Sequence, residues 1–120
     1  MKHYQGSFAG KPFVLLGWES WVLSNLWCWK YVSDGTRVIN KALILMARKN
    51  AKTALCAAIA LCHVIFDERG AEVDFLANNT SQASIAMNHT LHFAKSLDPK
   101  SKYFKRYRNS IKVPKTESII

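Results

Sequence analysis

The feature that most constrains the fold is an abrupt change of pattern between residues 41 and 66. Residues 41–47 read KALILMA, a short continuous apolar run that is typical of a strand covered on both faces. Residues 48–52 are polar and basic, and residues 53–66 are rich in Ala and Leu, which favour helix. The sequence therefore predicts a strand, a tight polar loop and a helix, in that order.

A second strand and helix are predicted directly afterwards. Gly70 ends the first helix, residues 71–77 (AEVDFLA) are expected to form a strand, and residues 78–80 supply turn and cap residues for a helix over 81–96. The Asp-Pro pair at 98–99 closes that helix. Strands that alternate with helices are joined by right-handed crossovers, so we expect an α/β domain with a parallel sheet and flanking helices.

Further elements are predicted on either side of these two strand–helix units. Residues 18–29 (WESWVLSNLWCW) have apolar side chains at three- and four-residue spacings, which predicts an amphipathic helix and favours a core or subunit contact for the tryptophans over a base-stacking platform. Asp34-Gly35 marks a turn, and residues 111–120 are expected to begin a further strand. Three cysteines without a CxxC spacing predict small core residues in a reducing compartment: Cys28, Cys56 and Cys62.

The size and hydropathy of the chain suit one small domain. A hydrophobic content of 49% is ample for a packed core in 120 residues. The first residues do not have the pattern of a secretory signal. The longest apolar run, residues 54–66, is well short of the roughly 20 residues that span a bilayer. We therefore expect no membrane contact.

Positive charge is concentrated in residues 100–115. The formal net charge is +9, and this segment holds seven cations and no acid, interleaved with Tyr103, Phe104 and Tyr107. Such a segment suits phosphate neutralisation and stacking on a nucleic acid. The candidates for this contact are Lys102, Lys105, Arg106 and Arg108. A solvated face of a helix or strand is the alternative interpretation.

The polar loop has part of the pattern of a phosphate-binding loop. A tight turn that feeds a helix directs backbone N–H groups and the helix dipole to one spot, where an anion is the natural occupant. The usual form is GxxxxGK[ST]. Lys52 and Thr53 hold its last two places, but Met46 and Ala51 stand where glycines are expected. A basic turn capped by Thr53 is an equally good interpretation of the loop alone. Three cations lie where the dipole disfavours positive charge unless an anion binds: Arg48, Lys49 and Lys52.

These segments carry a resemblance to a known family. RKNAKT, between an apolar run and an Ala-rich helix, resembles the RKNGKS/T form of the phosphate loop in the large terminase subunit of tailed bacteriophages. Residues 8–30 (FAGKPFVLLGWESWVLSNLWCWK) resemble the family's GKPF-x-L-x-x-WQ stretch and the helix after it. Residues 70–99 resemble its second strand and helix, including the pair Gln82-Ala83. The resemblance covers residues 6–115 and preserves motif order.

The resemblance implies a partial P-loop NTPase fold, with residues 1–120 as the N-terminal part of a terminase ATPase domain. It implies that Lys52 holds the β- and γ-phosphates of ATP, that Thr53 binds Mg²⁺ through its hydroxyl, and that Arg48 is the catalytic loop arginine facing the γ-phosphate. The implied phosphate cradle also includes Lys49, Asn50 and Ala51. The implied adenine contacts are Trp18 and Glu19.

The chain departs from the family pattern at two positions. Ala51 replaces the glycine before the lysine, and its added methyl is expected to crowd the phosphate or strain the turn. Glu19 replaces a glutamine, and an ionised carboxylate can only accept hydrogen bonds from an adenine edge.

The family also implies partners and a location. They are double-stranded viral DNA, the portal protein, the small terminase subunit and further copies in a ring, in the host bacterial cytoplasm. The family's acidic magnesium and water motif and its nuclease are expected beyond residue 120, so we expect nucleotide binding without efficient turnover. The alternatives are a basic nucleic-acid-binding protein that uses residues 100–115, or an inactive truncated gene product.

Overall fold

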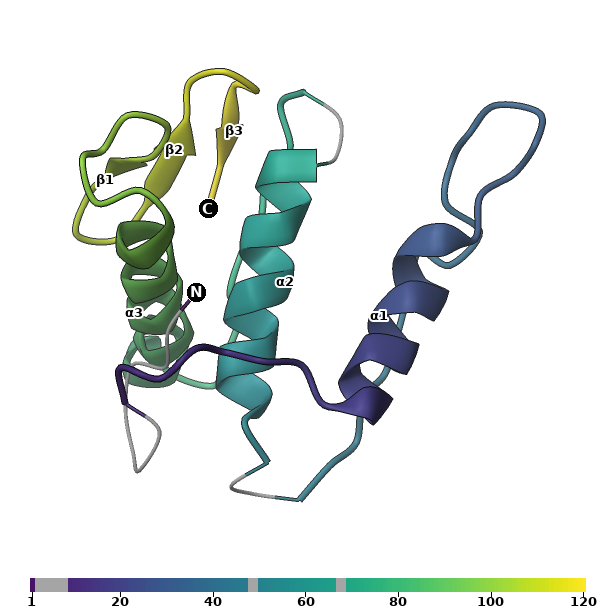
Figure 1. Cartoon of the computed structure of the whole chain (residues 1–120), viewed down its shortest axis with the longest axis horizontal. Coiled ribbons are helices and arrows are strands. Elements are labelled where there is room, and N and C mark those ends of the chain that lie inside the picture. The colour runs from purple at the N-terminus through teal and green to yellow at the C-terminus, as the bar shows by residue number, and fades with distance from the viewer. Residues whose placement is uncertain (2–8, 48–49, 67–68) are drawn as a thin grey trace. The chain divides into compact units, whose positions relative to one another are not determined.

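The computed structural model of the chain describes residues 1, 9–47, 50–66 and 69–120 (Figure 1). The chain divides into a first unit, Met1–Phe13 with Ala51–Ile120, and a second unit, Val14–Asn50. The second unit contains α1 (Gly17–Cys28), and the first contains α2 (Lys52–Phe66) and α3 (Thr80–Leu97). Three short strands follow α3: β1 (Lys105–Arg106), β2 (Ile111–Val113) and β3 (Ser118–Ile119). The fold class is therefore α/β, as expected.

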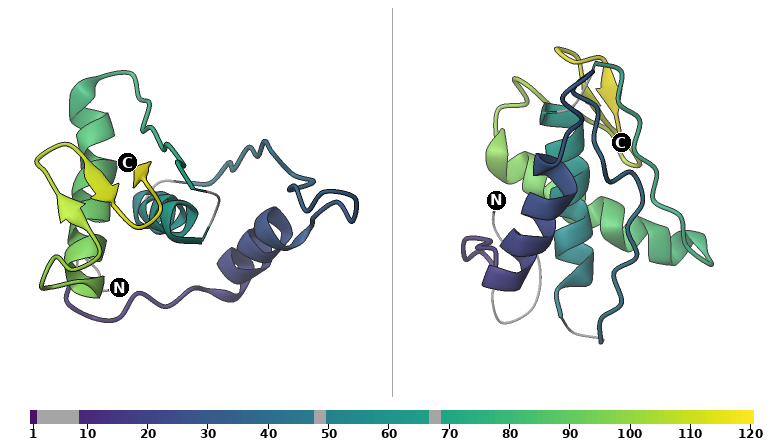
Figure 2. Two further views of the ribbon diagram at one scale, coloured as in Figure 1. Left: turned by 90° about the horizontal axis from the view of Figure 1, so that it is seen from above. Right: turned by 90° about the vertical axis from the view of Figure 1, so that its right-hand side faces the viewer.

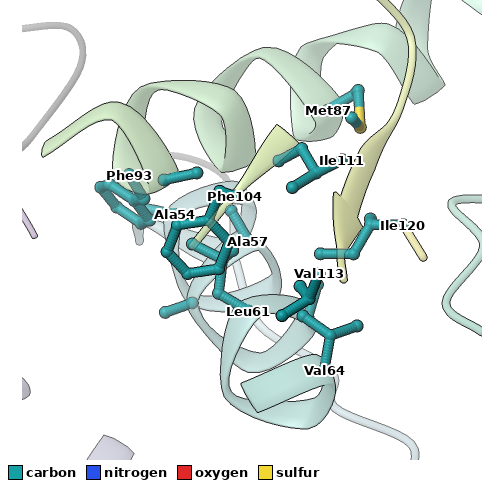
Figure 3. Packing of buried hydrophobic residues seen from close by; sticks show 13 residues of the cluster. Ala54, Ala57, Leu61, Val64, Met87, Phe93, Phe104, Ile111, Val113 and Ile120 are labelled. Atoms are coloured by element: carbon teal, nitrogen blue, oxygen red, sulfur yellow. The ribbon is translucent and has the colours of Figure 1, made fainter. Parts of the chain in front are cut away.

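The hydrophobic core of the described residues lies in the first unit, where α2 packs against α3 and the strands (Figure 1 and Figure 2). Ala57, Leu61 and Val64 recur at the spacing of one helical face and are fully buried. In Figure 3, Val64 lies beside Val113 and Ile120. Alanines on this face let neighbouring elements approach α2 closely, which explains why a helix of small side chains can sit at the centre of a core.

The sheet is antiparallel, and the prediction of a parallel sheet was wrong. Its strand order is β1-β2-β3, with Lys105 opposite Lys112 and Val113 opposite Ser118. Side chains alternate along β2, so Ile111 and Val113 are buried in the core while Lys112 is exposed. Short turns join consecutive strands, and such turns produce antiparallel pairing, whereas parallel strands need a long crossover.

The two strands predicted from apolar runs are not formed. Residues 41–47 are irregular, with Leu43 and Leu45 more than 80% exposed. Residues 71–77 are also irregular except for one parallel bridge between Glu72 and Ile119. The burial predicted for residues 41–47 was therefore wrong as well, because an apolar run becomes a buried strand only where a neighbour pairs with its backbone, and sequence pattern does not supply one.

The predicted helices are confirmed, with ends close to those expected. Asn79 caps α3, and its side-chain oxygen accepts a hydrogen bond from the Gln82 N–H at 2.8 Å. The predicted Asp34-Gly35 turn is also confirmed: the Asp34 carboxylate accepts hydrogen bonds from the backbone and the hydroxyl of Thr36, and Gly35 has a φ of 74°.

Thr116 joins the far end of α2 to the turn between β2 and β3. Its hydroxyl donates to the Val64 carbonyl oxygen at 3.1 Å, and its own carbonyl accepts from the Gly70 N–H at 2.7 Å. The last turn of a helix leaves carbonyl groups without intrahelical partners, so Thr116 satisfies a group that would otherwise need water. The helix and the sheet are thereby fixed to each other by a hydrogen bond as well as by packing.

Asp98 organises the chain between α3 and β1. It is 5% exposed, and its carboxylate accepts hydrogen bonds of 2.6–2.9 Å from three backbone N–H groups, those of Lys102, Tyr103 and Phe104. The Arg106 guanidinium donates to the Asp98 carbonyl oxygen and to the Ser101 hydroxyl. Desolvation raises the pKa of Asp98, but the three donors and Arg106 outweigh it and hold the pKa below its ordinary value of 3.8.

Replacing Leu61 with Ala tests the position of the core. Leu61 is fully buried on α2, so we expect Leu61→Ala to lower the free energy of unfolding by about 2–5 kcal/mol. The control is Leu76→Ala, because Leu76 is 94% exposed and its removal should change stability by less than about 0.5 kcal/mol. Urea denaturation followed by circular dichroism measures both. Equal effects of the two substitutions would contradict the described core.

Replacing Asp98 with Asn tests the turn before β1. A folded-state pKa below 3.8 means that ionised Asp98 stabilises the fold above that pH and that this stabilisation is lost as pH falls through the folded-state pKa. We therefore expect Asp98→Asn to lower Tm by several degrees at pH 7. The difference in Tm from the unaltered chain should shrink below about pH 4. A difference that stays constant from pH 7 to pH 3 would contradict this role of the charge.

Candidate nucleotide-binding loop

The residue before α2 has an unusual backbone conformation. α2 begins at Lys52, and Ala51 immediately before it has a φ of 53°. This left-handed conformation costs an L-residue about 1–2 kcal/mol, whereas glycine adopts it freely. Ala51 thus stands at a position where the backbone favours glycine, which is the residue that the phosphate-loop pattern expects there.

The start of α2 has the electrostatic character of an anion site. Its first N–H groups have no intrahelical partners, and the helix dipole adds partial positive charge at this end. The first turn contains no acid. Lys52 is exposed and Thr53 is half-buried, and the Ala51 carbonyl accepts the first helical hydrogen bond from Leu55 at 2.9 Å. Donors, a cation and a hydroxyl are therefore adjacent at one helix terminus.

The charge of Lys52 extends along the first turn of α2. Partial burial raises the pKa of the Cys56 thiol above its ordinary value of 9.0, and the positive charge of Lys52 offsets part of that increase. Residues four apart lie on the same side of a helix, so Lys52 acts over the helix surface at this end. Cys56 stays a thiol at neutral pH.

The prediction of cysteines in the core was wrong, since Cys28 and Cys56 are exposed and Cys62 is only half-buried.

The remaining predicted loop residues are described only in part. Arg48 and Lys49 lie outside the described residues, so their predicted roles stay predictions. Asn50 is exposed and immediately precedes Ala51. Trp18, predicted to contact adenine, lies on α1 in the second unit and is 40% exposed. Its role also stays a prediction.

Glu19 has a structural role that sequence reasoning missed. It is 2% exposed, and its carboxylate accepts a hydrogen bond from the Leu16 N–H at 2.7 Å. Leu16 is the N-cap of α1 and Glu19 is the third helical residue, so the contact is one half of a capping box. The signal was hidden because Leu16 has no side-chain oxygen to complete the pattern. The adenine contact of Glu19 stays a prediction.

The four cations predicted to contact nucleic acid do not share one environment. Lys102, Lys105 and Arg108 are exposed, whereas Arg106 is half-buried and bound to the Asp98 turn. The structure instead places Lys112 directly opposite Lys105. Sequence reasoning counted Lys112 in the basic segment but not among the four candidates, although the pattern Ile-Lys-Val at 111–113 indicates an outward lysine between two inward residues.

A cleft of about 340 Å³ lies between α3 and β1. None of the predicted nucleotide residues lines it; the lining residues are Asn88, Leu91, His92, Lys95 and Arg106. In the part of the chain that the structure describes, no group of three or more metal-binding side chains comes together. The helices within the same residues all lack the length and apolar character that crossing a bilayer requires.

Comparison with known proteins assigns the family. A family model for the terminase large subunit, ATPase domain, matches residues 17–120, which include α1, the loop, α2, α3 and all three strands. The chain therefore belongs to the terminase large subunit ATPase domain family. Neither the curated proteins nor the solved structures contain a match. This membership confirms the resemblance seen in the sequence and associates the chain with the phage DNA-packaging motor.

Replacing Ala51 with Gly tests the left-handed conformation. Glycine removes the steric cost at φ 53°, so we expect Ala51→Gly to raise the free energy of unfolding by about 1 kcal/mol. The matched control is Ala86→Gly inside α3, which should lower it by about 1 kcal/mol because glycine is a poor helix former. Chemical denaturation measures both. A loss of stability in both variants would show that Ala51 does not need a left-handed backbone.

Proposed function

We propose that the chain is an ATP-binding part of a phage DNA-packaging motor and that the loop at the start of α2 holds the phosphates. The observation that carries the proposal is the left-handed backbone conformation of Ala51, which lies directly before Lys52 and Thr53, the first two residues of α2. A left-handed residue lets a chain turn sharply into a helix and direct successive N–H groups toward one anion. Membership in an ATPase-domain family supports the same interpretation.

The residues around the loop fit the requirements of Mg²⁺ and ATP. Lys52 supplies an exposed ammonium for the β- and γ-phosphates, and Thr53 supplies the hard hydroxyl oxygen that Mg²⁺ prefers. When bound, ATP supplies a phosphoanhydride bond whose hydrolysis can drive movement. The chain's own part is to neutralise and orient that group. We also propose that this loop and α2 belong to a P-loop NTPase fold. A parallel sheet is not part of the proposal.

Further roles within the proposal rest on the family. Arg48 stabilises charge on the γ-phosphate, Lys49 adds to the positive field, and the backbone N–H groups of Asn50 and Ala51 complete the cradle. The adenine contacts are Trp18 and Glu19, the latter already engaged by the Leu16 N–H. The partners are double-stranded viral DNA, the portal protein, the small terminase subunit and further copies in a ring, in the host bacterial cytoplasm.

Isothermal titration of the chain with Mg-ATP tests the phosphate site. Charge-assisted hydrogen bonds contribute about 1.5–3 kcal/mol each, so we expect Lys52→Ala to weaken binding about 10- to 100-fold. The control is Lys41→Ala, which removes one positive charge from an exposed position outside the loop and should leave binding unchanged. Thr53→Ala should reduce the dependence of affinity on Mg²⁺.

Two results would refute the proposed site. One is the absence of Mg-ATP binding by the folded, unaltered chain. The other is equal affinity in the Lys52→Ala and Lys41→Ala variants, which would mean that nucleotide binds through general positive charge.

The second candidate function is nucleic-acid binding without nucleotide, which the exposed cations of residues 100–115 favour. Three results together would favour this candidate over the first. The chain would bind DNA in a salt-sensitive manner, it would not bind Mg-ATP, and its affinity for DNA would be the same in the Lys52→Ala variant.

A further inference from the structure

The hairpin of β1 and β2 places two lysines directly opposite each other. The register pairs Lys105 with Lys112, and both side chains are exposed. Opposite residues of an antiparallel pair have Cβ atoms about 4.5–5.5 Å apart and project from the same face of the sheet. Two ammonium groups therefore share one small area of surface, which is an arrangement that destabilises a sheet unless an anion lies nearby.

This face is the one that points away from the core. Ile111 and Val113 flank Lys112 and are buried, so Lys112 is directed to the opposite side. Arg106 pairs with Ile111 and thus belongs to the inner face, where its guanidinium holds the Asp98 turn. The outer face accordingly presents Lys105 and Lys112 without Arg106.

Few acids lie in the strands and turns around the lysine pair: Glu117 is in the turn before β3, and Glu72 is bridged to Ile119. The row across the sheet continues from Lys112 to Ile119 and then to Glu72. A spacing of about 4.8 Å between strands puts Glu72 about 10 Å from Lys112, near a Debye length in physiological salt. Within the described residues neither lysine forms an ion pair with an acid, and residues 99–116 contain none.

Protection of a sheet edge explains only one of the two lysines. Lysine on an edge strand discourages pairing with another chain, and β1 is an edge strand. Lys112 lies on β2, the central strand of the three, where that function does not apply. Its position next to Lys105 therefore calls for a ligand rather than for edge protection.

We propose that the outer face of β1 and β2 binds the phosphodiester backbone of a nucleic acid through Lys105 and Lys112. A nucleic acid carries closely and regularly spaced phosphates, so two adjacent lysines are neutralised together. An isolated carboxylate on a protein surface would satisfy only one of them. Other exposed cations of the same segment add to the positive field: Lys102, Arg108 and Lys115. Tyr107, 53% exposed at the hairpin turn, adds a ring for stacking.

The proposal does not depend on the loop at the start of α2. Lys52 and the lysine pair lie on different elements, and neither proposal uses a residue of the other. Failure to bind Mg-ATP therefore leaves the proposed nucleic-acid face intact, and loss of nucleic-acid binding leaves the nucleotide proposal intact.

The test is a fluorescence-anisotropy titration of the full chain with a short labelled DNA duplex. We expect Lys112→Glu to weaken binding about five- to tenfold and to reduce the slope of log affinity against log salt by at least about 1. The matched control is Lys41→Glu, which changes net charge equally at an exposed position of the second unit. Equal weakening in the two variants overturns the proposal, because overall charge would then explain binding.

A stability measurement separates lost binding from lost folding. Lys112→Glu places opposite charges across the β1–β2 pair, so its Tm should equal or exceed that of the unaltered chain while its affinity falls. Lys112→Gln provides a second variant without a new charge and should also bind more weakly than Lys41→Gln. Unchanged affinity in a folded Lys112→Gln variant overturns the proposal.

Two further probes define the ligand. A labelled single strand of the same length tests whether bases stack on Tyr107. If they do, Tyr107→Leu weakens binding of the single strand; if only phosphates are bound, the affinity of this variant is unchanged. Both results agree with a phosphodiester ligand. Polyglutamate that competes as well as DNA at equal charge concentration would instead indicate an acidic protein partner and would overturn the assignment.

Discussion

The packing of α2 against α3 and the inner face of the strands holds the first unit together. Ala57, Leu61 and Val64 make the contact from α2, and Phe93 of α3 and Val113 of β2 belong to the same buried cluster (Figure 3). Because the α2 face is built from small side chains and branched aliphatics, the backbones approach closely and exclude water. The position of the loop before α2 and the outward direction of Lys112 both follow from this contact, since each is fixed by the side that α2 and β2 must bury.

Positive charge is used in different ways at the two ends of the first unit. Arg106 is bound within the fold, where it and three backbone donors stabilise an ionised Asp98. Lys52, by contrast, adds charge to a helix terminus that is already positive. Lys105 and Lys112 repel each other across a hairpin. The lysine pair is unfavourable in the chain alone, and the start of α2 concentrates positive charge, so both lead to anionic ligands in our proposals.

The helices could be predicted from sequence because their signals are local. The alanine and leucine content of 53–66 and the Asn79 cap act within a few residues, and α2 and α3 begin within one residue of the expected positions. The strands predicted at 41–47 and 71–77 are not formed, because an extended segment is stable only when enough of its backbone pairs with a neighbour that its own sequence does not identify. β1 and β3 are two residues each, too short for an alternating pattern. The candidate loop was recognised through Lys52 and Thr53, and the glycine that the pattern expects at Ala51 already indicated a strained turn, which agrees with its φ of 53°.

The hydrogen bond between Thr116 and Val64 gives α2 a mechanical character. Its 15 residues form a rod about 22 Å long, with the Ala51 turn at one end and an anchor to the β2–β3 turn at the other. A helix of this length resists compression and bending, and its sides are clamped by the core. The loop residue before Lys52 and the turn that carries Thr116 are therefore attached to opposite ends of one packed helix, about 22 Å apart along its axis.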